Sequence, residues 1–321
     1  MNRRTALYTI LSTLYGSYIA GAKTMSDKKT VLQYLMFAHP GHKKPYWEFS
    51  KQWDEKYGTQ ILKMMGHNVL FPPDGQDGSG DFSRPQIREC LQNIDAQAYP
   101  YVMINMEREA YALQNGYIIP ETISKKVNCI DFCKQTRPDL KFAYYKEPPA
   151  DQRLLSGGNL FDNAKWKGKC EELQPVAKRQ AWYCPCVYPD RNWGGITVAT
   201  DYLKRQIEVC RAYGDQPIYP IICMEYLDLW RGWRASMKQQ KLWETGEYLH
   251  TPDPDERKNL EARLMSGRCW RQLMRTALQE GDGCVIWGGQ GSPCWWDEAP
   301  WWQETIELLY DFNVVPGIIN N

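Results

Sequence analysis

Short apolar runs alternate with longer amphipathic segments along the chain. Each short run is bounded by Pro, Gly or Asp, which is typical of buried strands. These runs are Val31–Ala38, Asn68–Phe71, Tyr101–Met106, Lys141–Tyr145, Ala181–Tyr188, Ile218–Glu225 and Gly283–Trp287. The segments with helical period are Tyr46–Met65, Arg84–Ile94, Pro120–Arg137, Thr197–Tyr213 and Asp255–Gln279. Strands that alternate with helices predict βαβ units and a parallel sheet.

The residues after the first run indicate how the sheet is arranged. Ala38-His39-Pro40-Gly41-His42 follows that run, and it is not a glycine-rich phosphate loop. A doubly wound nucleotide-binding sheet is therefore disfavoured. We predict an α/β fold, a TIM-like (β/α) barrel of seven or eight parallel strands. The active site of such a barrel lies at the carboxyl ends of its strands.

Composition narrows the function. The 321 residues suit a single barrel, and 39 Lys+Arg against 38 Asp+Glu leave a net charge of +1. Nucleic acid is therefore not an expected partner. No run reaches the ~20 apolar residues of a membrane span. The chain has 14 Trp and 20 Tyr against 8 Phe. This surplus favours a cleft that stacks flat, hydroxyl-rich ligands.

The N-terminus and the cysteines bear on cellular location. Basic residues at Arg3 and Arg4 precede the short apolar run Ala6–Leu11, and the small residues Ala20–Ala22 follow it. We interpret residues 1–24 as a signal peptide or an N-terminal extension, and residues 25–321 as one catalytic barrel. A signal peptide would make the protein secreted or periplasmic. The 11 Cys and 4 His have no zinc-site spacing, so we expect no metal and no cofactor, and mostly reduced, buried thiols.

Polar, aromatic and acidic residues follow the predicted strands. They are Asp74; Asn105 and Glu107; Tyr145 and Glu147; Tyr188 and Asp190; Glu225 and Tyr226; and Trp287, with Trp295 and Trp296 in the loop after the last strand. A carboxylate in a parallel strand is costly unless it is paired or faces a wet cleft. Each acid is thus either a cleft residue or half of an ion pair at the rim. Trp301 and Trp302, by contrast, are expected to begin the last helix and pack inward.

Asn105 and Glu107 form the sharpest local constellation. Period two in a strand places both side chains on one face, roughly 6.5–7 Å apart along the chain. A protonated Glu107 can act as general acid on a glycosidic oxygen. Asn105 can be neither a base nor an oxygen nucleophile, but it can orient an amide. The pair therefore favours substrate-assisted hydrolysis, in which a 2-acetamido group of the substrate attacks the anomeric carbon.

The order of these motifs resembles the seven-stranded barrel of the hyaluronidase family. The resemblance rests on Met103–Glu107, Ala143–Pro148, Pro185–Tyr188, Pro220–Tyr226 and Gly281–Gly288, and it covers roughly residues 30–310. It implies a glycosidase in which Glu107 is catalytic, Tyr188 contacts substrate and Trp287 lines the cleft. Asn105 stands where that family has Asp, which argues against hyaluronan itself. The Asn-x-Glu arrangement is similar to the catalytic strand of endo-β-N-acetylglucosaminidases.

Three functions remain open from the sequence. The first is a retaining, substrate-assisted glycosidase for a glycan containing N-acetylhexosamine. The second is a glycosidase that uses two carboxylates, Glu107 with Glu225 or Glu147, on a non-acetylated polysaccharide. The third is a catalytically silent carbohydrate-binding barrel. In each case the partner is an oligo- or polysaccharide; the expected contacts are Asp74, Tyr145, Tyr188, Asp190, Tyr226, Trp287, Trp295 and Trp296. The sequence predicts no oligomeric state.

Overall fold

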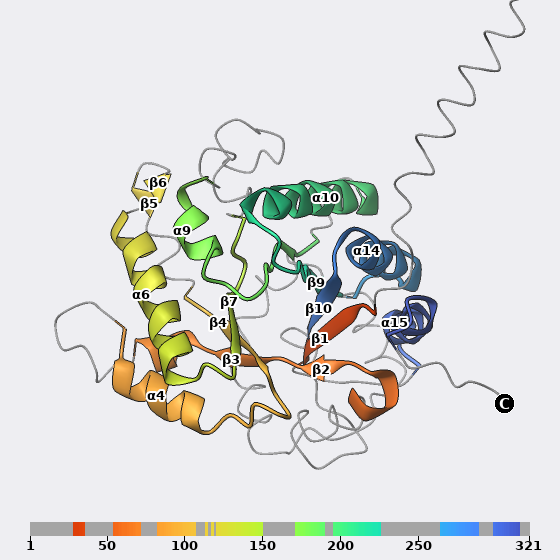
Figure 1. Cartoon of the computed structure of the whole chain (residues 1–321). Helices are drawn as coiled ribbons and strands as arrows, with labels where there is room; N and C mark the ends of the chain where they lie inside the picture. The colour runs from red at the N-terminus through yellow and green to blue at the C-terminus, as the bar shows by residue number, and fades with distance from the viewer. Residues whose placement is uncertain are drawn as a thin grey trace, which may run out of the picture.

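The computed structural model describes residues 28–35, 54–71, 82–106, 113–114, 117–118, 120–149, 171–189, 195–225, 264–288 and 298–314 (Figure 1). Its strands are β1 (Thr30–Leu35), β2 (Gln60–Ile61), β3 (Lys63–Met65), β4 (Tyr101–Ile104), β5 (Leu113–Gln114), β6 (Tyr117–Ile118), β7 (Lys141–Tyr144), β8 (Cys186–Val187), β9 (Ile221–Cys223) and β10 (Gly283–Gly288). Its helices are α3 (His67–Leu70), α4 (Arg84–Gln92), α6 (Pro120–Thr136), α9 (Gln174–Ala177), α10 (Ile196–Tyr213), α14 (Gly267–Glu280) and α15 (Pro300–Asp311).

Parallel strands form two sheets that the chain joins directly. One sheet has the order β2-β1-β10-β9-β8 and the other the order β3-β4-β7. Only Leu62 separates β2 from β3, so one extended segment pairs with β1 in its first half and with β4 in its second. The ring does not close between β7 and β8, where a hydrogen bond from Ala181 N to Phe142 O (2.8 Å) spans the gap. The parallel α/β architecture is confirmed, whereas closure of the barrel is not.

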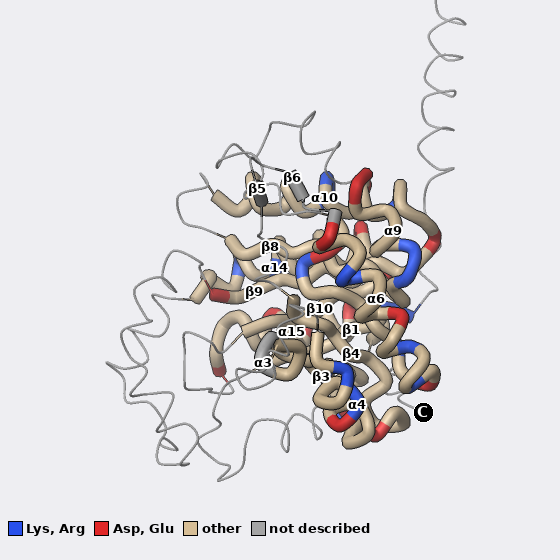
Figure 2. The backbone as a smooth tube through the Cα atoms, turned by 90° about the vertical axis from the view of Figure 1, so that its left-hand side faces the viewer, with Lys and Arg blue, Asp and Glu red and all other residues tan. Residues whose placement is uncertain are grey.

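Side chains alternate between the inside of this ring and its helical cover. The interior cluster consists of Leu32, Leu62, Tyr101, Met103, Ala143, Tyr145, Trp182, Cys184, Cys186, Tyr188, Tyr219, Ile221, Cys223, Val285 and Trp287. Outside it, α4 and α6 cover β3, β4 and β7, while α10, α14 and α15 cover the other strands (Figure 1). Basic and acidic residues are interspersed along the described elements (Figure 2).

Two predictions for the segment between β1 and α4 are wrong. Gln60–Met65, predicted as the end of a helix, forms β2 and β3, and Asn68–Phe71, predicted as a strand, lies largely in α3. The helical turn at 54–57 stops at Gly58, whose φ of 67° favours glycine. The Asp54 carboxylate then accepts hydrogen bonds from Thr59 Oγ1 (2.8 Å) and Ile61 N (3.0 Å), which starts the strand. Leu and Met are good helix formers, but burial between two strands overrides that preference.

The remaining helices agree better with the sequence. The structure confirms helices at Arg84–Ile94, Pro120–Arg137 and Thr197–Tyr213, apart from small shifts at their ends. The helix expected over Asp255–Gln279 begins only at Gly267, where Ser266 Oγ accepts a hydrogen bond from Cys269 N (3.4 Å). Residues 255–263 lie outside the described residues.

Buried tryptophans and free thiols match the remaining expectations. Trp301 and Trp302 begin α15 and are 2% and 3% exposed, as predicted. The nine described cysteines are free thiols, most of them buried. Within the described ranges, no helix is both long and apolar enough to cross a membrane. Residues 1–27 are not described, so the interpretation of the N-terminus stays a prediction.

Candidate active site

The carboxyl ends of the strands bring seven side chains to one end of the ring. The alternation of each strand places them on its inner face. They are Tyr34 on β1, Met64 on β3, Asn105 after β4, Tyr145 after β7, Tyr188 after β8, Glu225 after β9 and Trp287 on β10. In α/β barrels this is the catalytic end. Five of the seven were predicted site residues, whereas Tyr34 and Met64 were missed.

Trp287 lies between two tyrosine rings. The Tyr34 ring stacks on it with centroids 4.5 Å apart and planes at 24°. Tyr145 covers the other face at 5.0 Å and 30°. Trp287 is 1% exposed, and its indole Nε1 is buried without a hydrogen-bond acceptor in the described part of the chain. Trp287 therefore offers a polar edge, and not an open face for stacking a sugar.

The Tyr145 and Tyr188 hydroxyls form a short hydrogen bond to each other. Burial, the largest cause, raises the pKa of Tyr188 well above its usual value, and burial also raises the pKa of Tyr34. Tyr34 and Tyr188 therefore stay protonated at neutral pH and can act as hydrogen-bond donors, not as bases. Lys146 Nζ lies 4.7 Å and 4.9 Å from the ring centroids of Tyr145 and Tyr188.

Asn105 carries a polar atom without a partner. Its backbone N–H donates to Met65 O (2.9 Å), which fixes the end of β4 against β3. Its side-chain Nδ2 lies 3.9 Å from Met64 Sδ, a weak acceptor. The amide oxygen Oδ1 is buried and accepts no hydrogen bond from the described residues. A buried acceptor left unpaired costs ~1–3 kcal/mol, so this atom is placed to accept from a donor beyond the described residues.

Glu147 and Glu225, the two candidate catalytic carboxylates that the structure describes, have different surroundings. Glu225 is 2% exposed and continues the inner face of β9 after Ile221 and Cys223. It lies close enough to Cys223 to contribute, after burial, to the raised pKa of that thiol. Glu147 instead forms a buried ion pair with Lys126 of α6, outside the ring. In the structure Glu147 is therefore half of an ion pair, the alternative to a cleft residue that the sequence left open.

Several predicted site residues lie outside the described residues. They are Asp74, Glu107, Asp190, Tyr226, Trp295 and Trp296. Their place in the site stays a prediction from the strand pattern. Among the residues that the structure does describe, no group of three or more His, Cys, Asp and Glu side chains is arranged to hold a metal ion.

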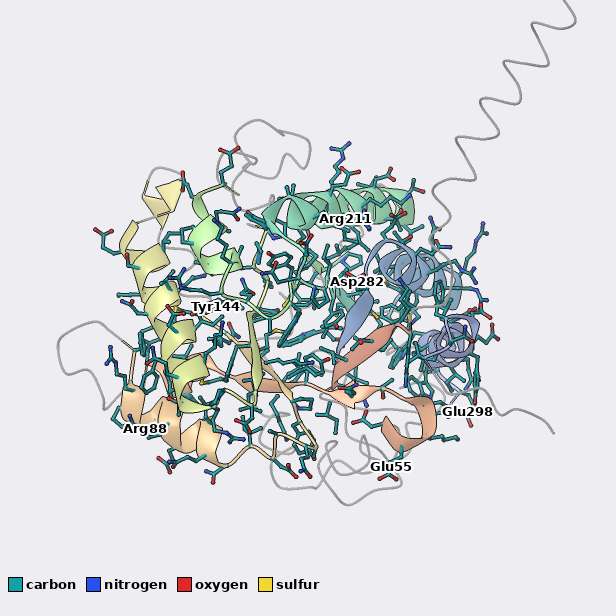
Figure 3. The ribbon with its side chains drawn as sticks, in the orientation of Figure 1. Glu55, Arg88, Tyr144, Arg211, Asp282 and Glu298 are labelled. Carbon is teal, nitrogen blue, oxygen red and sulfur yellow. The ribbon has the colours of Figure 1, made fainter. Side chains whose placement is uncertain are left out.

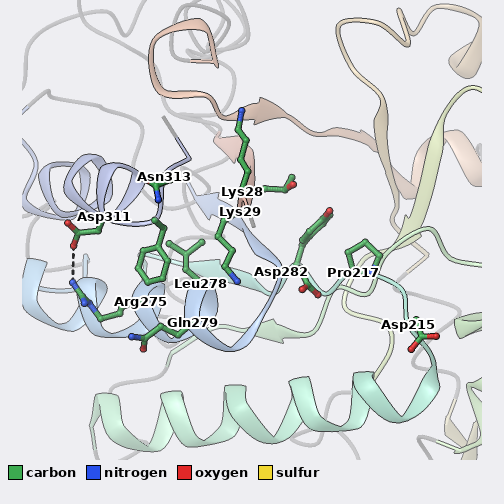
Figure 4. A pocket seen from close by; sticks show the side chains of 13 residues that line it. Lys28, Lys29, Asp215, Pro217, Arg275, Leu278, Gln279, Asp282, Asp311 and Asn313 are labelled. Carbon is green, nitrogen blue, oxygen red and sulfur yellow. Dashed lines mark hydrogen bonds and ion pairs between the residues drawn. The ribbon is translucent and has the colours of Figure 1, made fainter. Parts of the chain in front are cut away.

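A hollow of about 710 Å³ lies at the opposite, amino-terminal end of the strands (Figure 4). Four of its charged side chains are already engaged: Arg275 pairs with Asp311 (3.0 Å), Lys29 Nζ donates to Gly281 O (2.9 Å), and Asp282 accepts from Ile218 N (3.0 Å). Among the buried side-chain atoms that lack a partner in the described residues, Asn105 Oδ1 and Trp287 Nε1 lie at the carboxyl ends of the strands, where α/β barrels carry their active sites. That end is therefore the better candidate for the active site.

Comparison with solved structures places the fold. Bee venom hyaluronidase in complex with a hyaluronic acid tetramer matches with a TM-score of 0.53 and 12% identity, over 89% of this chain and 96% of that one. A monoclinic crystal structure of bee venom hyaluronidase matches with a TM-score of 0.52 and 12% identity, over 89% and 97% of the two chains. No family profile and no curated protein sequence matches the chain. At this identity the likeness shows the fold alone, an α/β arrangement of parallel strands and covering helices like that of these barrels.

Proposed function

We propose that this protein is a retaining glycoside hydrolase for a glycan that contains N-acetylhexosamine. The observation that carries the proposal is the buried, unpaired Oδ1 of Asn105 at the carboxyl end of β4. An acetamide N–H is a donor of the kind this atom lacks. The similar fold supports the same class, because bee venom hyaluronidase is a protein of this fold whose crystal structure is a complex with a hyaluronic acid tetramer.

Asn105 orients the acetamide of the substrate. Because Nδ2 faces Met64 Sδ, the other end of the side-chain amide, Oδ1, is left to accept the acetamide N–H. That hydrogen bond turns the acetamide carbonyl oxygen toward the anomeric carbon and increases its nucleophilicity. The asparagine thus replaces a carboxylate nucleophile by positioning one that the substrate carries.

Glu107 moves the protons. It comes two residues after Asn105 in the sequence, and continuation of the strand period would place it on the same face. Protonated Glu107 donates its proton to the leaving glycosidic oxygen as the acetamide oxygen attacks the anomeric carbon and the glycosidic bond breaks. The carboxylate then takes a proton from a water molecule that opens the cyclic intermediate. Two inversions give net retention and restore the acid.

Aromatic and polar groups around this pair bind the reactive sugar. The Tyr145–Tyr188 hydroxyl pair and Trp287 Nε1 supply hydrogen bonds on one side of the ring of strands. Further contacts are proposed from the sequence at Asp74, Asp190, Tyr226, Trp295 and Trp296. We also propose that the barrel begins near residue 25 and that the protein is secreted or periplasmic, which N-terminal sequencing of the mature chain tests.

A second candidate uses Glu107 and Glu225 as two protein carboxylates. The burial of Glu225 on the inner face of β9 favours it over Glu147, whose carboxylate is paired with Lys126. Such an enzyme would not need an acetamide and would act on plain hexose polymers. The third candidate is a catalytically silent carbohydrate-binding barrel, and the experiment must distinguish it from the two glycosidases.

The experiment measures reducing-end release from glycans with and without N-acetylhexosamine. Wild type, Glu107→Gln, Asn105→Ala and Glu225→Gln are compared on both sets. The proposal predicts release only from the acetamido set, with both Glu107→Gln and Asn105→Ala impaired. Release from plain polymers that Glu225→Gln abolishes would replace it by the second candidate. Binding of acetamido glycans without any release would indicate the silent barrel.

A further inference from the structure

The turn after β7 is held from outside the barrel by a buried ion pair. Lys126 Nζ, from the middle of α6, donates to Glu147 Oε2. Lys126 is 2% exposed, and the Glu147 side chain is 12% exposed. Burying two charges is costly, and a buried pair frequently adds little to stability over apolar packing. The more informative question is therefore which geometry the pair imposes.

Lys126 contacts both ends of this turn. The Tyr144 hydroxyl donates to Lys126 O (2.7 Å), and Lys126 Nζ lies 5.3 Å from the centroid of the Tyr144 ring. Glu147, three residues later, takes the charge of the same lysine. Figure 3 labels Tyr144 between β7 and α6. Residues 144–147 are therefore fixed to one residue of the helix.

The residues inside the turn face the candidate site. Tyr145 points inward, stacked on Trp287 and hydrogen-bonded to Tyr188. Lys146 has a φ of 64°, in the left-handed region that a residue other than glycine occupies only when its surroundings hold it there. The contacts of Lys126 with Tyr144 and Glu147 lie on either side of this residue in the sequence.

We propose that Glu147 and Lys126 are positioning residues of the active site, which hold the 144–147 turn so that Tyr145 meets Tyr188 and Trp287 at the reactive sugar. The inference rests on the proposed glycosidase function. It assigns Glu147 a role through Tyr145, with its carboxylate directed to α6, and removes it from the candidates for base or nucleophile.

Three variants test the proposal. Glu147→Gln leaves the Lys126 ammonium without its counter-charge, and Lys126→Met leaves the Glu147 carboxylate without its donor. We expect the turn to loosen in both variants. Positioning errors on this scale cost roughly 10- to 100-fold in kcat. In the double variant Lys126→Met with Glu147→Leu, apolar side chains replace the pair and can pack without an unpaired charge. We expect the double variant to recover most of the lost kcat.

Two kinetic outcomes would overturn the proposal. A double variant as inactive as Glu147→Gln would mean that the carboxylate itself reacts. Folded single variants with unchanged kcat would mean that the pair has no influence on the site. The matched control is Asp131→Asn, which breaks an ion pair of the same helix with Arg179 (2.8 Å) at half-exposed positions. It should leave kcat unchanged.

Hydrogen exchange gives a readout that does not need turnover. A peptide spanning 144–149 should exchange faster in both single variants, and at wild-type rates in the double variant and in Asp131→Asn. If wild type hydrolyses no glycan, the proposed function fails while exchange still decides whether the pair holds the turn. If wild type is active and neither exchange nor kcat changes in the single variants, the positioning role fails while the glycosidase stands.

Discussion

Tyr34 stacks on Trp287 with ring centroids 4.5 Å apart, across the neighbouring strands β1 and β10. The strand register pairs these two residues directly, so the stack follows from the parallel ladder itself. With Tyr145 on the opposite face, the indole can meet a substrate only through its edge. This changes the role expected for a cleft tryptophan from sugar stacking to hydrogen bonding through Nε1.

Trp287→Phe tests that role. The substitution keeps an aromatic ring between Tyr34 and Tyr145 but removes the N–H donor, so kcat/KM should fall by up to about 10-fold. Trp270→Phe is the control, because Trp270 Nε1 donates to Thr305 Oγ1 (2.8 Å) between α14 and α15, away from the site. The control should lower stability and leave kcat/KM unchanged. Equal activity in Trp287→Phe and wild type would rule out the donor role.

Asn105→Leu should separate activity from stability. The leucine removes a buried acceptor that has no donor in the described chain, so the free energy of unfolding should stay equal or rise. Turnover of acetamido glycans should fall ~100-fold or more, as on removing a hydrogen-bonding group at a reacting centre. Asn105→Asp keeps an acceptor and should retain measurable turnover. A strongly destabilised Asn105→Leu would show that Oδ1 has a structural partner.

Asp54 should make stability depend on pH. Burial raises its pKa from 3.8 to about 6, against the opposing effect of hydrogen bonds from Thr59, Gln33 and Ile61. A carboxyl that holds its proton more tightly when folded stabilises the protein fully below about pH 4, and that contribution is lost as pH rises through about 6. In Asp54→Asn the free energy of unfolding should therefore decline less as pH rises from 4 to 7, by at most ~3 kcal/mol.

Urea unfolding between pH 4 and 7 measures this difference. The exposed Asp201→Asn variant is the control and should follow the wild-type curve. Parallel curves for Asp54→Asn and wild type would contradict the assignment of the pH dependence to Asp54.

Gly283 is a position where β1 and β10 approach too closely for a side chain. A Cβ there would lie 1.8 Å from Thr30 O, a backbone atom that can move only with the strand. Gly283→Ala should therefore lower the free energy of unfolding by ~3 kcal/mol or more, the upper end of overpacking effects. Gly66→Ala is the control, since its Cβ meets nothing within 4 Å. Equal thermal midpoints for the two variants would contradict the close approach.

The sequence predicts those parts of the fold where composition and period agree. Tyr101–Ile104 and Gly283–Gly288 are fully buried and bounded by turn residues, and both are strands. Gln60–Met65 is missed because its Leu and Met residues are helix formers and only the neighbouring strands make it extended. Gly58, two residues before that segment, is the local sign that the helical turn ends.

The site is predictable to the extent that it depends on strand alternation. Asn105 and Trp287 are found by that rule, and Tyr34 follows from it as well, because it is two residues after the inward-facing Leu32. The rule fails where the partner is distant in sequence. Nothing local indicates that Glu147 turns outward, since its partner Lys126 lies 21 residues away in a helix whose other charges are largely solvated.

The central claim is that the substrate supplies the nucleophile and Asn105 orients it. The most direct measurement is NMR detection of the first anomer released from an N-acetylhexosamine glycan by the full chain, beside a matched substrate whose acetamide is replaced by hydroxyl. The account predicts that the anomeric configuration is retained, with release only from the acetamido substrate and loss of release in Glu107→Gln. An inverted anomer, or equal release from both substrates, would contradict it.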